Sequence, residues 1–564
     1  MMEEINQLKN KDKEKEVIFT TITFVLFFLV ACWKLVNASL WYDETIEYWY
    51  SKIMFGPLPF EPDSPNTNMY KRIVSTYQPP LYNFVMWIWL KIYDSEWWFR
   101  FSGVVIGTVG MAGLFKAVKE YSKNTYIACF SVIFATFTWR IIYYYQECAE
   151  YTLLLSTLFW LLYYFVRLLN QIDKKSIIGL VISSVLSVYS QYGAVFPVAI
   201  FLIAAFIYVF VKKFKTDKKI IIFMTVSYLV AFVVFALPLY FLFVKPQFFA
   251  QRKGSPLTSV VFENGFFHDF WRSILAVFKW NFFNNFAESE IKAILILSFI
   301  FVFLPLIYSK DWNYRILFIM NICVYAFYYA LVKKGLYANV SYKHGFGNRY
   351  NLFFAPLWIF ILFASFFENV NFIKEISGKK IWKIKFSPYL SQILVAASLV
   401  VVLCYCTVNW NRELFANWKK QDARGAVSAW YDKNGSKETT IVSRPGANAF
   451  CYYVRHNIRY SNSVEDNVHY EQKWFNEESF HAWFEENFAD RPSQIFYFES
   501  HNAKIRDSHI KWLQNHGYRC DKAFSTILYK CTYDMKNDKF LSNETLIKKT
   551  SEKYATTARI DIKN

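Results

Sequence analysis

VIFTTITFVLFFLVACWKLV, residues Val17–Val36, is the first of many apolar runs in this chain and decides its fold class. The run is long enough to span a bilayer, whose hydrocarbon core of about 30 Å needs about 20 apolar residues. A lysine-rich segment, residues 9–15, precedes it, so we interpret the run as an uncleaved signal anchor with a cytoplasmic start. One alternative stays open: Leu29–Cys32 resembles a bacterial lipobox, which implies cleavage and lipidation at Cys32. The length of the run and the many spans after it favour the anchor.

The stretch WYDETIEYW, residues Trp41–Trp49, follows this run and places two carboxylates, Asp43 and Glu44, at a membrane exit. A charged pair at a bilayer boundary costs desolvation energy, which makes it a functional-site hypothesis. The alternative is that the two acids begin an amphipathic interfacial helix, where the helix dipole favours them. Other polar segments are expected on the same side of the membrane, which favours the functional interpretation.

The composition excludes several classes of protein. With 564 residues, of which 55% are hydrophobic and 21% aromatic, the chain is a polytopic membrane protein. The net charge of +19 does not indicate nucleic acid, because the lysines cluster in short loops between apolar runs, as the positive-inside rule explains. The nine cysteines show no metal-ligand spacing.

The sequence predicts a polytopic α-helical membrane domain, residues 1–408, followed by a soluble α/β domain, residues 409–564. About 11 spans are expected, at Val17–Val36, 101–118, 125–140, 151–169, 176–190, 193–211, 219–243, 291–308, 314–332, 350–367 and 388–408. The apolar segment 81–93 is too short to cross. If it lies in the interface, the lysine clusters all fall on the cytoplasmic side with the N-terminus.

This topology gathers the polar and irregular segments on the outer face, including outer loops 37–99 and 244–290 and the C-terminal domain. A transporter more often has polar groups near the bilayer midplane on helices broken by Gly or Pro. The clean spans and the polar rim therefore favour an enzyme at the outer leaflet. A sugar or lipid carrier, or a catalytically inactive membrane scaffold, stays as the alternative.

Five motifs in a fixed order carry a resemblance. They are Asp43-Glu44 after the first span, Gln78 to Tyr82 (QPPLY), Arg100, Gln146-Glu147 with Tyr151, and Arg349-Tyr350 with Pro356. Their order and spacing resemble the GT-C membrane glycosyltransferases, in the glycosyltransferase family 39-like branch that holds the protein mannosyltransferases and the lipid A aminoarabinose transferases. The tail, opening with residues 421–426 (QDARGA), is also similar to bacterial members.

The chain departs from that pattern at three positions. Gln78 stands where such proteins often have His, Ala149 where Arg is common, and Gln191 where His is frequent. Each change removes a charged or titratable group, so acid–base chemistry is not assigned to these positions. The substitutions bear on substrate choice and on activity.

The resemblance implies inverting transfer of a sugar, hexose or pentose, from a polyprenyl-phosphate donor to a glycan, lipid or protein acceptor. It implies a bacterial inner or plasma membrane, with the active site and the C-terminal domain outside the cytoplasm. We assign Asp43 as the base that takes the proton of the acceptor hydroxyl, with Glu44 orienting the loop or binding the sugar. Fixed cations and donors are expected on the departing phosphate. The donor-binding candidates are Arg349, Tyr350, Gln78, Tyr82, Glu147 and Gln191, with Arg252, Lys253, Lys333, Lys334 and Lys343 in reserve.

No cofactor is firmly indicated. A divalent cation near Asp43 and Glu44 stays open, although the sequence offers no third ligand. The expected partners are the lipid-linked donor, an acceptor and membrane lipids, with no nucleic acid. In the tail, strands are predicted at 439–443, 494–499 and 524–530 and a helix at 505–517. A disulfide between Cys520 and Cys531 is weighed equally against two unrelated thiols.

Overall fold

The computed structural model describes residues 2–61, 68–76, 78–251, 266–282, 288–333, 348–377, 380–381, 384–385, 387–409, 422–456, 467–471 and 477–538. The chain forms two compact units. The first unit contains residues 1–35 and 70–417, and the second contains residues 36–69 and 418–564. The second unit is therefore built from two segments that are far apart in the sequence.

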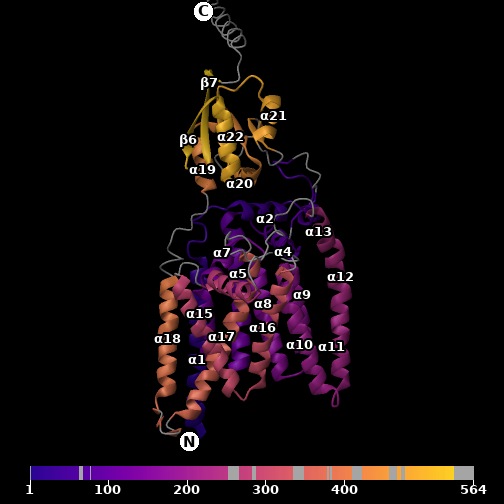
Figure 1. The fold of residues 1–564 in the computed structure, drawn as a ribbon, viewed down its shortest axis with the longest axis vertical. Helices are drawn as coiled ribbons and strands as arrows, with labels where there is room; N and C mark the ends of the chain where they lie inside the picture. Colours follow the sequence, from indigo (N-terminus) through magenta and orange to yellow (C-terminus); the bar gives the residue numbers. More distant parts are fainter. Residues whose placement is uncertain are drawn as a thin grey trace, which may run out of the picture. The chain divides into compact units, whose positions relative to one another are not determined.

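The first unit is helical, and Figure 1 shows its long helices running side by side. The helices are α1 (Met2–Cys32), α4 (Leu81–Trp89), α5 (Glu96–Ser122), α6 (Thr125–Thr136), α7 (Trp139–Gln146), α8 (Tyr151–Asn170), α9 (Lys174–Ser190), α10 (Val195–Lys213), α11 (Lys218–Ala231), α12 (Leu237–Leu239), α13 (Lys245–Gln251), α14 (Phe266–Phe282), α15 (Glu288–Tyr308), α16 (Trp312–Lys333), α17 (Phe354–Ile376) and α18 (Leu390–Asn409). The short helix α3 (Met69–Val74) lies at the boundary of the two units, and a two-stranded hairpin, β1 (Lys380–Ile381) and β2 (Ile384–Lys385), precedes α18.

Every predicted span coincides with a helix. By length and composition, seven helices in the described residues suit a membrane crossing, or eight if α6 and α7, bent by 69°, form one broken span. The other three predicted spans are α9, with 17 residues, and the shorter apolar helices at Lys292–Tyr308 and Gln392–Val408. Helix α9 rises about 26 Å over its 17 residues, slightly less than the hydrocarbon thickness, whereas α15 has 21 residues and α18 has 20.

The segment predicted to lie in the interface contains α4, a helix of nine residues. It rises only about 14 Å, so it is too short to cross a bilayer. It begins directly after Pro79 and Pro80, as the preference of proline for helix starts predicts.

Helices α5 and α8 pack closely along a stripe of glycines on α5 (Gly103, Gly107, Gly110 and Gly113). At Gly110, an added Cβ would lie 2.7 Å from Tyr145 Oη and 2.8 Å from Ser156 Cα, both far inside van der Waals contact. Small residues of this kind let membrane helices approach each other at backbone distance.

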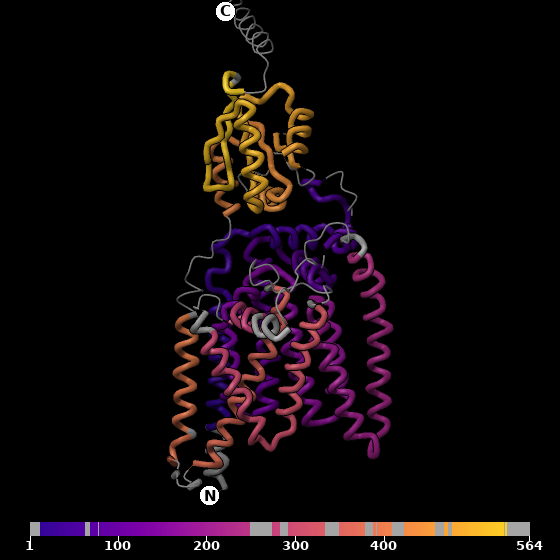
Figure 2. Tube along the Cα trace, viewed as in Figure 1, coloured from indigo at the N-terminus to yellow at the C-terminus, as the bar shows by residue number. Residues whose placement is uncertain are grey.

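The run Lys218–Phe248, α11 to α13, is one continuous helical path with two π-helical turns at Phe232–Ala236 and Tyr240–Val244. Figure 2 shows it as an unbroken trace along one side of the first unit. Only 11% of its most apolar stretch is buried inside the protein, so its apolar side chains are available to lipid.

The second unit holds a five-stranded sheet in the order β4-β3-β5-β7-β6. Its strands are β3 (Thr439–Val442), β4 (Val468–Tyr470), β5 (Gln494–Phe498), β6 (His516–Phe524) and β7 (Leu528–Asp538), and its helices are α2 (Tyr42–Lys52), α19 (Ala423–Asp432), α20 (Arg444–His456), α21 (Glu477–Asn487) and α22 (Ala503–Asn515). Strands β4, β3 and β5 are parallel, while β7 and β6 are antiparallel additions. The predicted α/β class of this domain is confirmed.

Alternating strand residues cover the two faces of the sheet. On one face, Ile441, Ile495 and Tyr497 pack against α21 and α22. On the other face, Phe498 contacts Phe450 of α20, and Phe450 contacts Trp430 of α19. Helices therefore cover both faces of the sheet.

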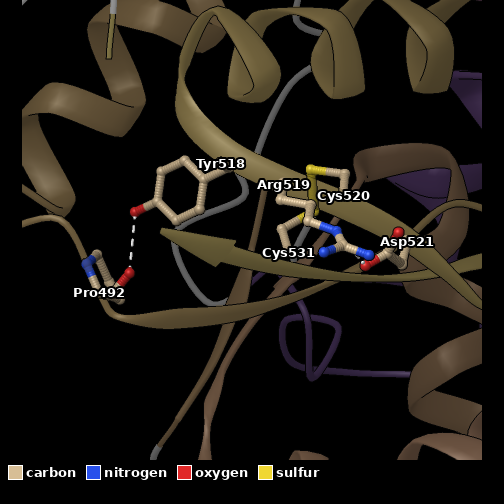
Figure 3. The surroundings of a disulfide bond; sticks show 6 residues. All are labelled: Pro492, Tyr518, Arg519, Cys520, Asp521 and Cys531. Atoms are coloured by element: carbon tan, nitrogen blue, oxygen red, sulfur yellow. Dashed lines mark hydrogen bonds and ion pairs between the residues drawn. A yellow bond between two sulfur atoms is a disulfide. The ribbon is translucent and has the colours of Figure 1, made fainter. Parts of the chain in front are cut away.

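Cys520 and Cys531 stand opposite each other on β6 and β7 and form a disulfide. Figure 3 shows this bond, together with the hydrogen bond from the Tyr518 hydroxyl to the Pro492 carbonyl. The sequence left open a disulfide or two unrelated thiols, and the structure contains the disulfide.

Segment 36–69 was expected in an outer loop of the membrane domain, but the structure includes it in the second unit. The reason is visible in α2, whose Tyr48 and Trp49 are buried. The Tyr48 ring contacts Tyr452 of α20, and Trp49 Nε1 donates a hydrogen bond to the Asn448 carbonyl at 2.9 Å. Burial of these two aromatic side chains joins the early segment to the C-terminal domain.

Candidate active site

Asp43 and Glu44 lie in the first turn of α2, and the structure gives them different surroundings. Glu44 is fully buried, and its Oε2 accepts a hydrogen bond from the Trp41 backbone N–H at 3.3 Å. This is the carboxylate half of a capping box, with Glu44 at the third helical position. The alternative interpretation of the acids as helix-starting residues therefore holds for Glu44. Asp43 is half-buried at the second helical position.

The remaining predicted residues, Gln78, Tyr82, Glu147, Gln191, Arg349 and Tyr350, belong to the first unit. The structure thus places the two carboxylates of α2 in one unit and the donor-binding candidates in the other. The two groups are described separately below.

Gln78 lies in a polar network in the first unit. Its Nε2 donates to Glu150 Oε2 at 3.2 Å, and its backbone carbonyl accepts from Gln247 Nε2 at 2.8 Å. Gln247 Oε1 in turn accepts from the Tyr192 hydroxyl at 2.8 Å. Gln247 is buried, so its amide ties together the segment before α4, the turn at Tyr192 and α13.

Gln191, next to Tyr192, caps a short helix. Its Oε1 accepts a hydrogen bond from the Gly193 backbone N–H at 2.7 Å, at the start of the 3-10 turn Tyr192–Ala194. Its side-chain oxygen thus has a local structural role. Tyr82, on α4, is buried with 1% of its surface exposed.

In the Gln146-Glu147 motif, Gln146 makes structural hydrogen bonds and Glu147 contributes a buried carboxylate. Gln146 Nε2 donates to the carbonyls of Ala31 and Trp33 at 3.0 and 2.8 Å. These carbonyls lie at the carboxyl end of α1, where the last turn leaves acceptors without intrahelical partners. Gln146 therefore fixes the end of the first helix, and Glu147, only 3% exposed, begins the turn toward α8.

Two arginines and two carboxylates surround Tyr144 on α7. Glu147, Arg140, Arg349 and Glu150 all act electrostatically on its hydroxyl. Tyr151 of α8 is in turn influenced by Glu150, Arg349 and Tyr350. The predicted residues Glu147, Arg349 and Tyr350 thus converge, although the sequence separates them by about 200 positions.

Arg349 and Tyr350 belong to the 3-10 turn Asn348–Asn351 that leads into α17. The Arg349 guanidinium lies 5.5 Å from the centre of the Tyr350 ring. The side chains of the five reserve cations, Arg252, Lys253, Lys333, Lys334 and Lys343, lie outside the described residues.

Sequence reasoning missed Arg140, Glu150 and Gln247. Arg140 lies over the Trp280 ring of α14 at 4.3 Å, and its Nε donates to the Trp280 carbonyl at 3.2 Å. Glu150 had a signal, because it follows Glu147 by three residues in the same motif. Gln247 had none, since only the fold brings α13 to Gln78.

An apolar cavity of about 640 Å³ lies between α6, α14, α15, α17 and α18. Its lining is almost entirely aromatic and aliphatic and includes Phe134, Phe278, Phe282, Trp358 and Leu394. Phe278 and Phe282 flank Trp280, the partner of Arg140, on α14. Arg140 therefore links the polar cluster to the helix that lines the cavity.

Within the described part of the chain, no group of three or more His, Cys, Asp or Glu side chains is arranged to hold a metal ion.

Comparison with known proteins gives two findings. Residues 77–241 match the dolichyl-phosphate-mannose-protein mannosyltransferase family. This stretch contains Gln78, Tyr82, Glu147 and Gln191, but neither Asp43 nor Arg349. No curated protein sequence matches the chain.

The fold is similar to two crystal structures of ArnT from Cupriavidus metallidurans. The structure bound to undecaprenyl phosphate has a TM-score of 0.52 at 10% identity, covering 93% of this chain and 98% of ArnT. The apo structure has the same TM-score at 9% identity, covering 94% and 99%. At this identity the likeness shows the fold.

Proposed function

We propose that the chain is a membrane glycosyltransferase of the GT-C superfamily, which transfers a sugar from a polyprenyl-phosphate donor to an acceptor at the outer face of the membrane. The observation that carries the proposal is the contact of Arg140 with Trp280 on α14, a helix that lines the apolar cavity, while Arg140 and Arg349 both act electrostatically on the buried Tyr144. The family match supports the class of donor, and the ArnT likeness supports the architecture.

The arginines suit the departing group. When the sugar leaves, the prenyl phosphate gains negative charge, and fixed guanidinium groups stabilise that charge in the transition state. Arg349 is anchored in a turn and Arg140 is held on Trp280, so both cations are positioned before the reaction begins.

The apolar cavity suits the prenyl chain. A polyprenyl tail is an unsaturated hydrocarbon, and the cavity offers it aromatic and aliphatic walls with almost no polar surface. The link from Arg140 to Trp280 on α14 lets one lipid place its phosphate at the arginines and its chain along Phe278 and Phe282.

Asp43 is proposed as the base. It removes the proton of the acceptor hydroxyl, the hydroxyl oxygen bonds to the anomeric carbon, and the bond from that carbon to the phosphate oxygen breaks. Attack opposite the leaving phosphate inverts the anomeric configuration. Glu44 orients the helix through its hydrogen bond to Trp41. The proposal includes a bacterial cell membrane with the C-terminal domain outside the cytoplasm.

A transfer assay tests the proposal. Purified protein receives a radiolabelled polyprenyl-phosphate sugar, and transfer to an acceptor or slow donor hydrolysis is the expected result. Arg349→Met and Arg140→Met should each lower kcat by about a hundredfold, as loss of a transition-state donor does. Arg519→Met, at a side chain 80% exposed on β6, is the control. Movement of intact donor across liposomes without bond cleavage would instead indicate a carrier. Runs with and without EDTA show whether a divalent cation takes part.

A further inference from the structure

Three parallel strands of the second unit end in polar residues at one edge of the sheet. Ser443 follows β3, Glu471 follows β4 and Glu499 follows β5. In open α/β sheets, the carboxyl ends of parallel strands are where ligands usually bind.

Ser443 and Glu499 at this edge are hydrogen-bonded to their own neighbours. The Ser443 hydroxyl donates to Glu499, and Glu499 Oε1 accepts from the Asn502 backbone N–H at 2.7 Å. A Glu471 oxygen lies 3.2 Å from His509 Nδ1. Burial raises the pKa of both carboxyls, Glu471 and Glu499. These contacts fix the loops at the edge in place.

The amino end of α2 is held at this edge. The Tyr42 ring stacks on His501, just after Glu499, with ring centres 4.1 Å apart. Arg444 and Glu499 both act electrostatically on the Tyr42 phenol. Arg444 also forms an ion pair with Glu61 and lies 5.7 Å from the Phe60 ring centre. The position that a ligand would take is thus used by side chains of segment 36–69.

The residues before α2 are tied to the same domain. The Leu40 backbone N–H donates to the Tyr453 hydroxyl at 2.6 Å, in a buried position. Ser39 Oγ donates to Asp422 at 3.2 Å, and Arg424 donates to the Val36 carbonyl at 2.9 Å. Asp43 is therefore flanked on both sides by residues that the C-terminal domain holds.

We propose that the carboxyl edge of the C-terminal sheet, with Tyr453 and Arg444 as its positioning residues, holds the amino end of α2 and so positions Asp43 for proton transfer. The inference rests on the proposed function, because it takes Asp43 as the base. A proton acceptor displaced by about 1 Å loses up to a hundredfold in rate, so the domain contributes to turnover by positioning Asp43.

Tyr453→Phe tests the proposal with a minimal change, since it removes only the hydroxyl that Leu40 uses. We expect kcat for transfer to fall about tenfold while the KM for the donor stays unchanged. Tyr518→Phe is the matched control, because Tyr518 is a buried tyrosine whose hydroxyl also bonds to a backbone group, in Figure 3 the Pro492 carbonyl. It should leave kcat within about twofold at a similar loss of thermal stability.

Arg444→Met gives a second variant and a readout independent of activity. Hydrogen exchange of the α2 amides should become at least about tenfold faster in Arg444→Met than in Tyr518→Phe. The proposal is overturned if the α2 amides exchange at the wild-type rate in both Arg444→Met and Tyr453→Phe. It is also overturned if both variants keep the wild-type kcat while the wild type is active. A wild-type protein that transfers no sugar refutes the proposed function instead, and the exchange data still decide whether the domain holds α2.

Discussion

Asp43 and Glu44 are adjacent in the sequence, and the structure gives Glu44 a capping role in α2. Its Oε2 accepts the Trp41 N–H and its side chain is fully buried, whereas Asp43 is half-buried. A sequence alone does not separate these roles, because both acids suit a helix start. The position of each acid within the first turn decides its role, because in a capping box the third helical residue reaches back to the backbone N–H of the N-cap residue.

Asp43→Asn should lower kcat for transfer by about a hundredfold or more, with normal expression and membrane insertion. The change is nearly isosteric and removes only the proton acceptor. Initial rates with a radiolabelled donor measure it. Near-normal turnover by this variant excludes Asp43 as the base.

Glu44→Gln is the companion variant with the opposite expectation. The glutamine side-chain oxygen still accepts the Trp41 N–H, as capping boxes allow. Turnover should stay within about threefold of wild type. A loss as large as that of Asp43→Asn would place Glu44 in the chemistry.

Glu499 makes the stability of the C-terminal domain depend on pH. Burial raises its pKa above the usual value, so the folded state binds the proton more tightly than the unfolded state does. This contribution to stability is complete below a pH of about 4.5, the usual pKa of Glu, and is lost as the pH rises through the folded-state pKa. His469 and His516, whose pKa values burial lowers, act in the opposite direction.

Glu499→Gln isolates the Glu499 contribution, because the amide mimics the protonated acid. We compare the exchange rates of the β5 amides in the variant and the wild type at each pH. As the pH rises from 5 to 8, exchange should become progressively slower in the variant than in the wild type. A difference that stays constant over this range would show that Glu499 titrates alike in both states.

At the scale of the elements, the glycine stripe of α5 sets the distance to α8. Gly110→Val would force a side chain against Tyr145 and Ser156, at atoms now 2.7 and 2.8 Å from the added Cβ position. Overpacking of this kind costs about 1–3 kcal/mol. We expect a lower midpoint of thermal unfolding in detergent. Val109→Leu, at a neighbouring side chain that is 53% exposed, should leave the midpoint unchanged.

The membrane spans were predictable because each is a long apolar run, and so were β3 and β5, whose buried residues are apolar and β-branched. Helices α14, α19, α20 and α21 were not predicted. The strand predicted at 524–530 was wrong at its start, since Ser525, with φ of 49°, lies in the turn between β6 and β7. Strand β6 was missed because charged residues such as Arg519 and Asp521 interrupt its pattern. Strand β4 has only three residues, too few for a periodicity.

At the scale of the whole molecule, the lysine partition predicts that the C-terminal domain lies outside the cytoplasm. Single cysteines at exposed positions 123 and 434, with the seven free cysteines replaced by serine, test this on intact cells. An impermeant thiol reagent should label position 434 and not position 123. The reverse pattern would invert the topology.

Part of the candidate site could be predicted from the order of the motifs along the whole chain. Glu147, Arg349 and Tyr350 were proposed from motif order, and in the structure Glu147 and Arg349 both act electrostatically on Tyr144, while Arg349 and Tyr350 act on Tyr151. Their role in the site stays a prediction. The membership of segment 36–69 in the second unit was not predictable. Its anchoring depends on contacts such as Leu40 with Tyr453, across more than 400 positions, for which one sequence holds no pattern.

The division of the second unit between two distant segments has a consequence for biosynthesis. Residues 36–69 leave the ribosome early, but their packing partners follow only after residues 70–417 have been made. At about 5–20 residues per second, roughly 20–80 s pass before α20 has been made. Throughout that interval Tyr48 and Trp49, almost wholly buried in the finished protein, have no docking surface in their own domain. A product truncated before α20 therefore lacks the surface on which Tyr48 and Trp49 are buried.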